Sequence, residues 1–274
     1  MLRFVSCLAL LLLLSGCAEL LGPPRHYQHA GSAVDYLYPD ATSAPQLQPE
    51  VTRLHPPVRV GIAFAPGSGD AVLAEPQKIA LLERVKGAFV QYPYIGTIQI
   101  IPSTYLRARG GFNNLEQVAR MFDVEVVALV SYDQVQFNDT NGLAVLYWTI
   151  VGAYVVHGDK YDVQTLLDIS VVDVASRKLL FRAPGTSEVK GAASMAGFSA
   201  HSREAAGVGF SQAADRMIPA LQAELEQFKQ RIKSDAAFKV ENRTGYSGAG
   251  DIGLFGVLGA LMLLAVLNAA RRSR

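Results

Sequence analysis

Residues 123–130 read Asp-Val-Glu-Val-Val-Ala-Leu-Val, and this stretch decides the fold class. The apolar run extends toward residue 135, so apolar side chains fall on both faces of the segment, which is typical of a central strand. Such a strand is stable only when both faces of its sheet are covered. The flanking segments are therefore expected to supply neighbouring strands and helices.

The segment before this strand predicts two further strands and two helices. Residues 58–64 alternate strictly, and residues 95–101 are rich in β-branched side chains between two prolines, so both are expected to be strands. Apolar residues at a spacing of four predict a helix over 77–90, opened by Pro76. A second, shorter helix is indicated by Leu115, Val118, Ala119 and Phe122, with Asn113 or Asn114 as its N-cap.

The segment after it predicts a hairpin and a long closing helix. Residues 166–174 and 178–182 flank Ala-Ser-Arg and favour two antiparallel strands. Apolar residues then recur every three or four positions from Phe210 to Ile232, as in an amphipathic helix. Pro219 is expected to kink this helix or to mark an earlier boundary.

These elements predict a single α/β domain over residues 58–232, a sandwich of two or three layers with a mixed sheet. Residues 123–130 and 167–179 resemble the periplasmic domains of curli-secretion-type and penicillin-binding-protein-activator lipoproteins. This resemblance implies the same α/β fold, and it implies little about function.

Composition excludes several classes of protein. Half of the 274 residues are apolar, which excludes extended disorder as the general state. The formal net charge of +1 argues against a nucleic-acid partner. The two cysteines, Cys7 and Cys17, both lie near the N-terminus, so the body holds neither a disulfide nor a thiolate metal site.

The N-terminus has the pattern of an export signal. Arg3 precedes an apolar run of about a dozen residues, which is too short to span a bilayer. The run ends in Leu14-Ser15-Gly16-Cys17, which resembles a bacterial lipobox. That resemblance implies removal of residues 1–16 by lipoprotein signal peptidase and attachment of membrane lipid (palmitate among its acyl chains) to Cys17. It places the protein in a Gram-negative envelope, and Ala18 favours the outer membrane. The alternative is an ordinary secretory signal.

The C-terminus predicts a second membrane anchor. Residues 252–270 carry no charge and would form a helix of about 28 Å, enough to span the hydrocarbon. The basic tail at 271–274 is expected to stay in the cytoplasm. The folded body would then lie outside the cytoplasm, in agreement with the lipobox.

A glycine-rich motif stands before this span, at the end of a linker over 233–251. Ser247-Gly248-Ala249-Gly250, the apolar span and the arginines together resemble the GlyGly-CTERM sorting signal, although the adjacent glycines of that signal are missing. With the lipobox, this arrangement resembles the rhombotarget lipoprotein family. The resemblance implies cleavage by a rhomboid-type protease (a rhombosortase) and transfer to the outer membrane or surface. The alternative is a plain transmembrane anchor.

Two other segments stand apart from the predicted domain. Seven of the 13 prolines fall within 18–57, so residues 17–57 are expected to form an extended tether, on which the tyrosines dock to the domain. Residues 143–156 are apolar and uncharged. They predict a soluble hairpin or buried helix, or alternatively a loop that contacts a membrane or a partner.

The sequence offers few candidates for catalysis. It holds no HExxH, CxxC, GxSxG or Walker motif. Residues 67–70 favour a plain loop over a nucleotide-binding one. A catalytic triad could be drawn from Ser199, His201 and Ser202 with Asp133 or Asp173. A serine and a histidine two positions apart seldom point at each other, so the pattern favours the start of a helix instead. His157, Asp159 and Asp162 favour a polar turn over a metal site. No cofactor and no metal are expected.

The sequence therefore predicts a non-enzymatic binding or assembly module that is anchored in the cell envelope. Its partner is expected to be another, unidentified envelope protein. The alternative function is an envelope hydrolase that uses the cluster of Ser199, His201 and Ser202.

Overall fold

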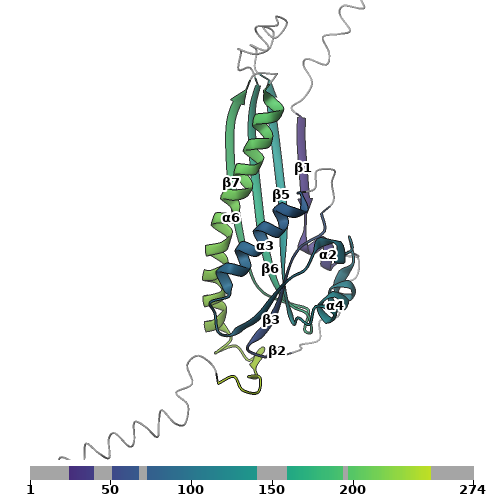
Figure 1. Cartoon of the computed structure of the whole chain (residues 1–274), viewed down its shortest axis with the longest axis vertical. Coiled ribbons are helices and arrows are strands. Elements are labelled where there is room, and N and C mark those ends of the chain that lie inside the picture. The colour runs from purple at the N-terminus through teal and green to yellow at the C-terminus, as the bar shows by residue number, and fades with distance from the viewer. Residues whose placement is uncertain (1–24, 40–50, 68–72, 141–158, 194–196, 248–274) are drawn as a thin grey trace, which may run out of the picture. The chain divides into compact units, whose positions relative to one another are not determined.

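The computed structural model describes residues 25–39, 51–67, 73–140, 159–193 and 197–247 (Figure 1). Its elements, in chain order, are β1 (Arg25–Gly31), α2 (Ala33–Leu37), β2 (Thr52–Leu54), β3 (Val58–Phe64), α3 (Glu75–Phe89), β4 (Ile95–Ile100), the 3-10 turn η1 (Ser103–Tyr105), α4 (Gly111–Met121), β5 (Val126–Thr140), β6 (Asp159–Asp173), β7 (Lys178–Ala193), α6 (Phe198–Arg231) and β8 (Phe238–Val240).

The main sheet is mixed, as expected. Its strand order is β4-β3-β5-β6-β7, and β1 pairs with β5. β3 runs parallel to both β4 and β5, with Val60 opposite Ile98 on one side and Val126 on the other. β6 and β7 are neighbours joined by four residues, a link short enough only for an antiparallel hairpin. The predicted strands are thus confirmed, and the hairpin strands are longer than expected.

Two compact units divide the described chain. One contains described residues from 1–28, 134–165 and 187–212, and the other contains those from 29–133, 166–186 and 213–274. The strands β1, β5, β6 and β7 and the helix α6 contribute residues to both. The expectation of an α/β domain with a mixed sheet is confirmed, and the second unit contains the complete β3 and β4 together with α2, α3 and α4.

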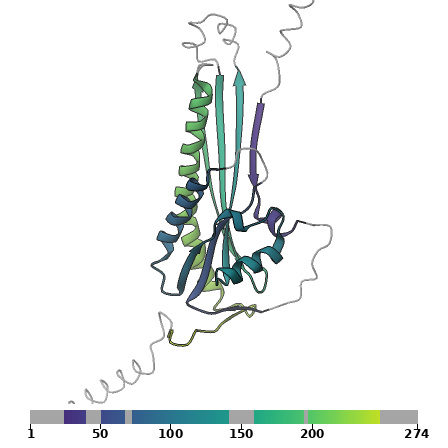
Figure 2. The ribbon, with the colours of Figure 1, turned by 45° about the vertical axis from the view of Figure 1, so that its right-hand side comes forward.

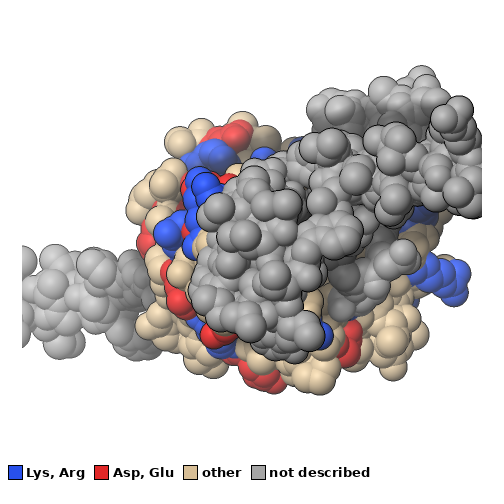
Figure 3. Space-filling model, turned by 90° about the horizontal axis from the view of Figure 1, so that it is seen from above, with Lys and Arg blue, Asp and Glu red and all other residues tan. Residues whose placement is uncertain are grey.

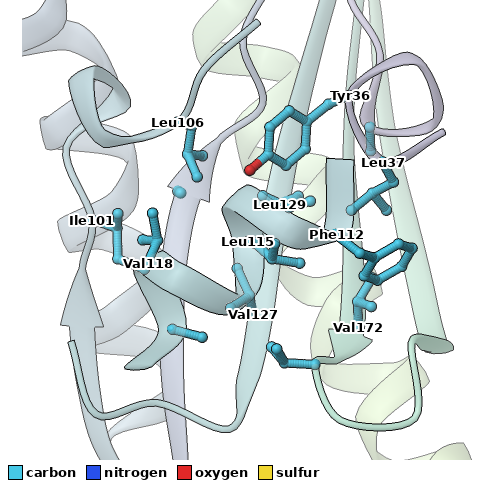
Figure 4. Packing of buried hydrophobic residues seen from close by; sticks show 14 of the residues in the cluster. Tyr36, Leu37, Ile101, Leu106, Phe112, Leu115, Val118, Val127, Leu129 and Val172 are labelled. Carbon is cyan, nitrogen blue, oxygen red and sulfur yellow. The ribbon is translucent and has the colours of Figure 1, made fainter. Parts of the chain in front are cut away.

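Helices lie on both faces of the sheet in this second unit, with α2 and α4 on one face and α3 on the other (Figures 1 and 2). The period-2 alternation of strands explains the arrangement. Ala63 of β3 and Val127 and Leu129 of β5 point toward α4, and they belong to a core completed by Leu115, Val118 and Tyr36 (Figure 4). Their neighbours in sequence point toward α3.

The helix α6 continues through Pro219, so this proline is not a boundary. The backbone of α6 packs closely against the backbone of β7 at Gly185. A Cβ added at Gly185 would lie 2.1 Å from the Ala213 carbonyl oxygen and 2.6 Å from the Met217 nitrogen. Gly185 therefore permits a contact that no other residue type allows without moving the helix.

The predicted start of α4 is wrong in detail. The N-cap is Gly110, and Asn113 and Asn114 lie inside the helix. The side chain of Asn114 turns inward, where its Oδ1 accepts hydrogen bonds from the Arg107 backbone N–H at 2.9 Å and from the Tyr36 hydroxyl at 3.0 Å. A buried asparagine with these partners explains why an apparent capping residue lies in the first turn.

Within residues 17–57, which were expected to be an extended tether, the structure places β1, α2 and β2. Tyr36 is 1% exposed and belongs to the core, so this tyrosine docks as the sequence suggested. The expected linker over 233–251 likewise contains β8, which pairs in parallel with β2. Among the described prolines, Pro39 lies in a turn after α2, and Pro56 and Pro57 form a bend between β2 and β3.

Both predicted membrane-related ends fall outside the described residues. Residues 1–24, with the lipobox and Cys17, are not described, nor are the span at 252–270 and the tail at 271–274. Among the helices that the structure describes, none is both long and apolar enough to cross a membrane.

Candidate ligand pocket

An apolar pocket of 880 Å³ lies between one face of the sheet and the helices α3 and α6. Every residue that lines it belongs to the second unit. β3 and β5 present aliphatic side chains to it at alternate positions, as a pleated strand requires. β4 presents Ile95 and Ile98, which lie three positions apart because the pairing register shifts between them. The strand residues that form the floor are Val58, Val60, Ile62, Ile95, Ile98, Val126, Ala128 and Val171.

The helices form the opposite wall. α3 contributes Val85 and Phe89, and the last turns of α6 contribute Leu221, Leu225 and Phe228. Three polar contacts hold α6 to the α3–β4 segment. Arg84 pairs with Asp215 at 2.5 Å, the Gln222 amide donates to the Ala88 carbonyl at 3.2 Å, and the Tyr94 hydroxyl donates to Glu226 at 3.1 Å.

The floor is less covered than its place in the sheet predicts. β3 lies between two other strands, a position that is usually shielded on both faces. On the α4 side this holds, since Ala63 is fully buried. On the pocket side Ile62 is buried as well, but Val58 and Val60, nearer the start of the strand, are only half-buried. The helices therefore leave apolar strand surface open, which is the feature of a ligand site rather than of a closed core.

Polar groups at the pocket are few and gather together. Lys229 Nζ lies 2.9 Å from Glu226 Oε2 and 4.8 Å from the centre of the Tyr94 ring. The hydrogen bond from Lys229 holds the pKa of the Glu226 carboxyl below its usual value. Burial, reinforced by the bond to Glu226, raises the pKa of the Tyr94 hydroxyl. Glu226 is therefore an anion and Tyr94 a neutral donor over the physiological range.

The C-terminal end of the described chain closes one side of the pocket. Val240, Asn242 and Tyr246 belong to its lining. Arg243 fixes this segment, because its Nη2 lies 2.6 Å from Glu125 Oε1 and its backbone N–H donates to the Pro56 carbonyl at 2.9 Å. The segment that leads toward the predicted processing motif is thus part of the pocket.

The predicted catalytic cluster lies at the start of α6 and is not assembled for nucleophilic catalysis. Ser199 and His201 are exposed, and Ser202 is buried and accepts a hydrogen bond from the Gln136 amide. His201 Nδ1 lies 3.8 Å from Glu204. Residues that are two positions apart in a helix differ by about 200° around its axis, so Ser199 and His201 point in different directions.

Two acidic residues that the sequence singled out have other contacts. Asp173, considered with this cluster, accepts hydrogen bonds from the Ser176 backbone N–H at 2.7 Å and from its hydroxyl at 2.6 Å, which closes the β6–β7 turn. Asp162, considered with His157 as a metal ligand, lies 3.5 Å from Lys190. Within the described ranges, no group of three or more His, Cys, Asp or Glu side chains could hold a metal ion.

Several predicted site residues fall outside the described parts of the chain. They are Leu14, Ser15, Gly16, Cys17, Gly248, Ala249 and Gly250, together with His157 and the apolar segment 143–156. Ser247 is described and exposed. Gly67 is an exposed loop residue, and the rest of the 67–70 segment is not described.

Comparison with known proteins adds no family. No protein-family model matches this chain, and no curated protein matches it. Among solved structures it is similar to the dodecamer of a PelC point variant from Paraburkholderia phytofirmans, at 14% identity and a TM-score of 0.27. The match covers 72% of this chain and 98% of that one. At this score the similarity carries no argument about fold or function.

The pocket could not be predicted from the sequence. Its lining residues have the same apolar periodicity as core residues, and period alone does not distinguish a filled space from an open one. One signal was present in the segment Tyr92-Pro93-Tyr94, where two tyrosines come directly before a strand. Paired tyrosines of this kind are typical of surfaces that are apolar on one side and wet on the other.

Proposed function

We propose that this protein is a lipid-anchored cell-envelope binding module that receives an apolar group of its ligand in the pocket of the second unit. The observation that supports the proposal is the pocket itself, whose floor of half-buried β3 valines faces open space. Sites that bind ligands are concave, mostly apolar and furnished with a few polar groups, as this one is.

The anchoring part of the proposal comes from the sequence. The lipobox cysteine, Cys17, would carry the lipid, and the span at 252–270 would hold the C-terminus until a rhomboid-type protease cuts near residues 247–250. The mature protein would then lie at the outer membrane or the surface of a Gram-negative envelope.

Site-specific photo-crosslinking tests the binding role. The full chain is expressed in its native host with p-benzoylphenylalanine in place of Tyr92, which lines the pocket. The same substitution at Tyr105, which is 44% exposed and lies outside the lining, is the matched control. We expect an adduct, with its molecule identified by mass, at position 92 and none at position 105. No adduct at position 92 would overturn the proposed function.

Intact mass measurement tests the two anchors. Protein purified from its own envelope should carry lipid on Cys17 and end near residues 248–251. Replacement of Gly248 and Gly250 by leucine should block the cut, because a glycine-rich segment unwinds more easily before proteolysis. A lipidated chain that still ends at Arg274 would show that the C-terminal segment is a permanent anchor.

A further inference from the structure

The charges at the pocket indicate what kind of ligand would carry the apolar group. This inference rests on the proposed function. The lining contains three charged residues, Glu226, Lys229 and Lys233. Glu226 is paired with Lys229, whereas Lys233 Nζ donates to the uncharged Gln230 amide at 3.1 Å. One positive charge therefore remains at the pocket, and it favours a ligand with an anionic head.

The polar groups lie together, and the rest of the lining is aliphatic or aromatic. Tyr92 and Tyr94 stack with ring centres 5.5 Å apart, and Tyr246 lies near enough to raise the pKa of the Tyr94 hydroxyl further. Tyrosines and lysines in this combination are typical of the level at which lipid head groups meet acyl chains. A ligand with a long apolar chain and a charged end matches both parts of the site.

The length of chain beyond the pocket places the site close to a bilayer. Tyr246 lines the pocket, and the predicted span begins at Ile252. Fully extended, the step between these two residues covers at most about 20 Å. While the span is in the membrane, the pocket is therefore held near the lipid surface, and the closest abundant amphiphile is phospholipid.

We propose that the pocket takes one acyl chain of a membrane phospholipid, with the phosphate of its head group beside Lys233. The chain would cover Val58, Val60 and Ile98, the open part of the floor. The second acyl chain would remain in the bilayer. The folded body would thereby be held against the membrane by a contact that neither Cys17 nor the C-terminal span supplies.

The crosslinking experiment at position 92 tests this inference when the adduct is weighed. A mass increase equal to a whole phospholipid is expected, on a peptide that contains position 92. The lipid on Cys17 does not interfere, because that residue lies on a different peptide. The presence or absence of the glycerophosphate head in the measured mass distinguishes a phospholipid from a free fatty acid.

Two substitutions, each with a matched control, locate the lipid. Ile98 lines the pocket on β4, at one end of the strand order, so Ile98→Trp fills the pocket. Leu179 is 53% exposed on β7, at the other end, and Leu179→Trp adds a similarly large side chain outside the lining. Ile98→Trp should lower the phospholipid adduct at least about tenfold, the effect of excluding about two methylene groups. Leu179→Trp should leave it unchanged.

Lys233→Glu tests the head-group contact without altering the apolar lining. It should lower the adduct about threefold at low salt and less at high salt, as for an exposed charge contact. Lys160→Glu, an exposed lysine outside the lining, should have no effect. Equal yields from the wild type, Ile98→Trp and Lys233→Glu would overturn the inference.

The outcomes separate this inference from the proposed function. A protein adduct or a free fatty acid at position 92 would overturn the phospholipid and leave the binding role intact. The absence of any adduct would overturn both. A phospholipid adduct that falls with Ile98→Trp and not with Leu179→Trp would support both.

Discussion

The hydroxyl of Tyr36 donates a hydrogen bond of 3.0 Å to Oδ1 of Asn114, although the two residues are 78 positions apart. The same oxygen accepts from the Arg107 backbone N–H, and the Asn114 amide lies 3.4 Å from the Tyr105 carbonyl oxygen. One buried amide thus joins α2, α4 and the loop before α4. The bond between Tyr36 and Asn114 is buried and the other two are partly buried, so these bonds depend on one another.

Asn114→Ala should therefore destabilise the protein strongly. The change leaves the Tyr36 hydroxyl buried without its partner and removes the partly buried bond from the Arg107 N–H, at a cost of about 2–4 kcal/mol. Tyr36→Phe removes only one of these bonds and should cost about 1 kcal/mol. Urea unfolding followed by circular dichroism measures both. Asn113→Ala, at the exposed neighbouring position, should change stability by less than about 0.5 kcal/mol. Equal effects at positions 113 and 114 would contradict the assignment.

Two glycines should respond in opposite directions to the same substitution. Gly185→Ala forces a methyl group into the α6 backbone and should destabilise the protein by about 3 kcal/mol. Gly87→Ala adds a methyl group on α3 where nothing lies within 4 Å, and it should stabilise by about 0.5–1 kcal/mol through helix propensity. Thermal unfolding of both variants gives the comparison, and a shift of the same sign in both would refute it.

Arg243 should control the opening of the C-terminal segment. Arg243→Ala removes the bond to Glu125, so the backbone N–H of Glu241, which donates to Leu54 at 2.9 Å, should exchange its hydrogen faster. We expect about a fivefold increase, which corresponds to ~1 kcal/mol for a partly exposed pair. Lys239→Ala removes a more exposed ion pair with Glu241 and should have little effect. Hydrogen exchange read by mass spectrometry distinguishes the two.

Low pH should reduce the stability that Glu226 contributes to the folded protein. Its bond from Lys229 lowers its pKa below 4.5, so it contributes stability above that pH and loses it as the pH falls through the lowered value. The stability difference between the wild type and Glu226→Gln should thus be constant at neutral pH and shrink below pH 4.5. Glu83→Gln, which lies outside the pocket lining, is the control variant for the same pH series. A difference that does not vary with pH would exclude this role for Glu226.

A fluorophosphonate probe should not label the serines at the start of α6. Ser202 is buried against Gln136, and Ser199 points away from His201 on the helix, so neither has a base to activate it. The measurement is in-gel fluorescence of the full chain, with a known serine hydrolase added as a positive control. Labelling that disappears with Ser199→Ala would restore the hydrolase alternative.

Much of the fold could be predicted because burial leaves a periodic trace. β3 alternates, α3 repeats its apolar residues every four positions, and β5 is apolar on both faces. The role of Asn114 could not be predicted, since a polar residue before an apolar run has the same pattern whether it caps a helix or turns inward. The elements β1, α2, β2 and β8 were missed because their stability comes from distant partners rather than from local propensity.

The pocket was beyond sequence reasoning for a related reason. Whether Val60 faces a tightly packed helix or open space depends on how closely α3 and α6 approach the sheet, and Gly185 and Arg84 set part of that approach. Charges offered no help, because lysines, arginines and acidic residues are interspersed over the surface seen in Figure 3. Helical spacing alone gathers Glu226, Lys229 and Lys233 near the end of α6, but only the three-dimensional arrangement places an apolar space beside them.

The parallel pairing of β2 with β8 also fixes an order of events during folding. Arg53 and Lys239 are register partners, so β2 cannot complete its pairing until residues near position 239 are in place. Contacts between positions so far apart in the chain form slowly. Completion of this ladder, and with it the C-terminal side of the pocket, is therefore among the last steps of folding.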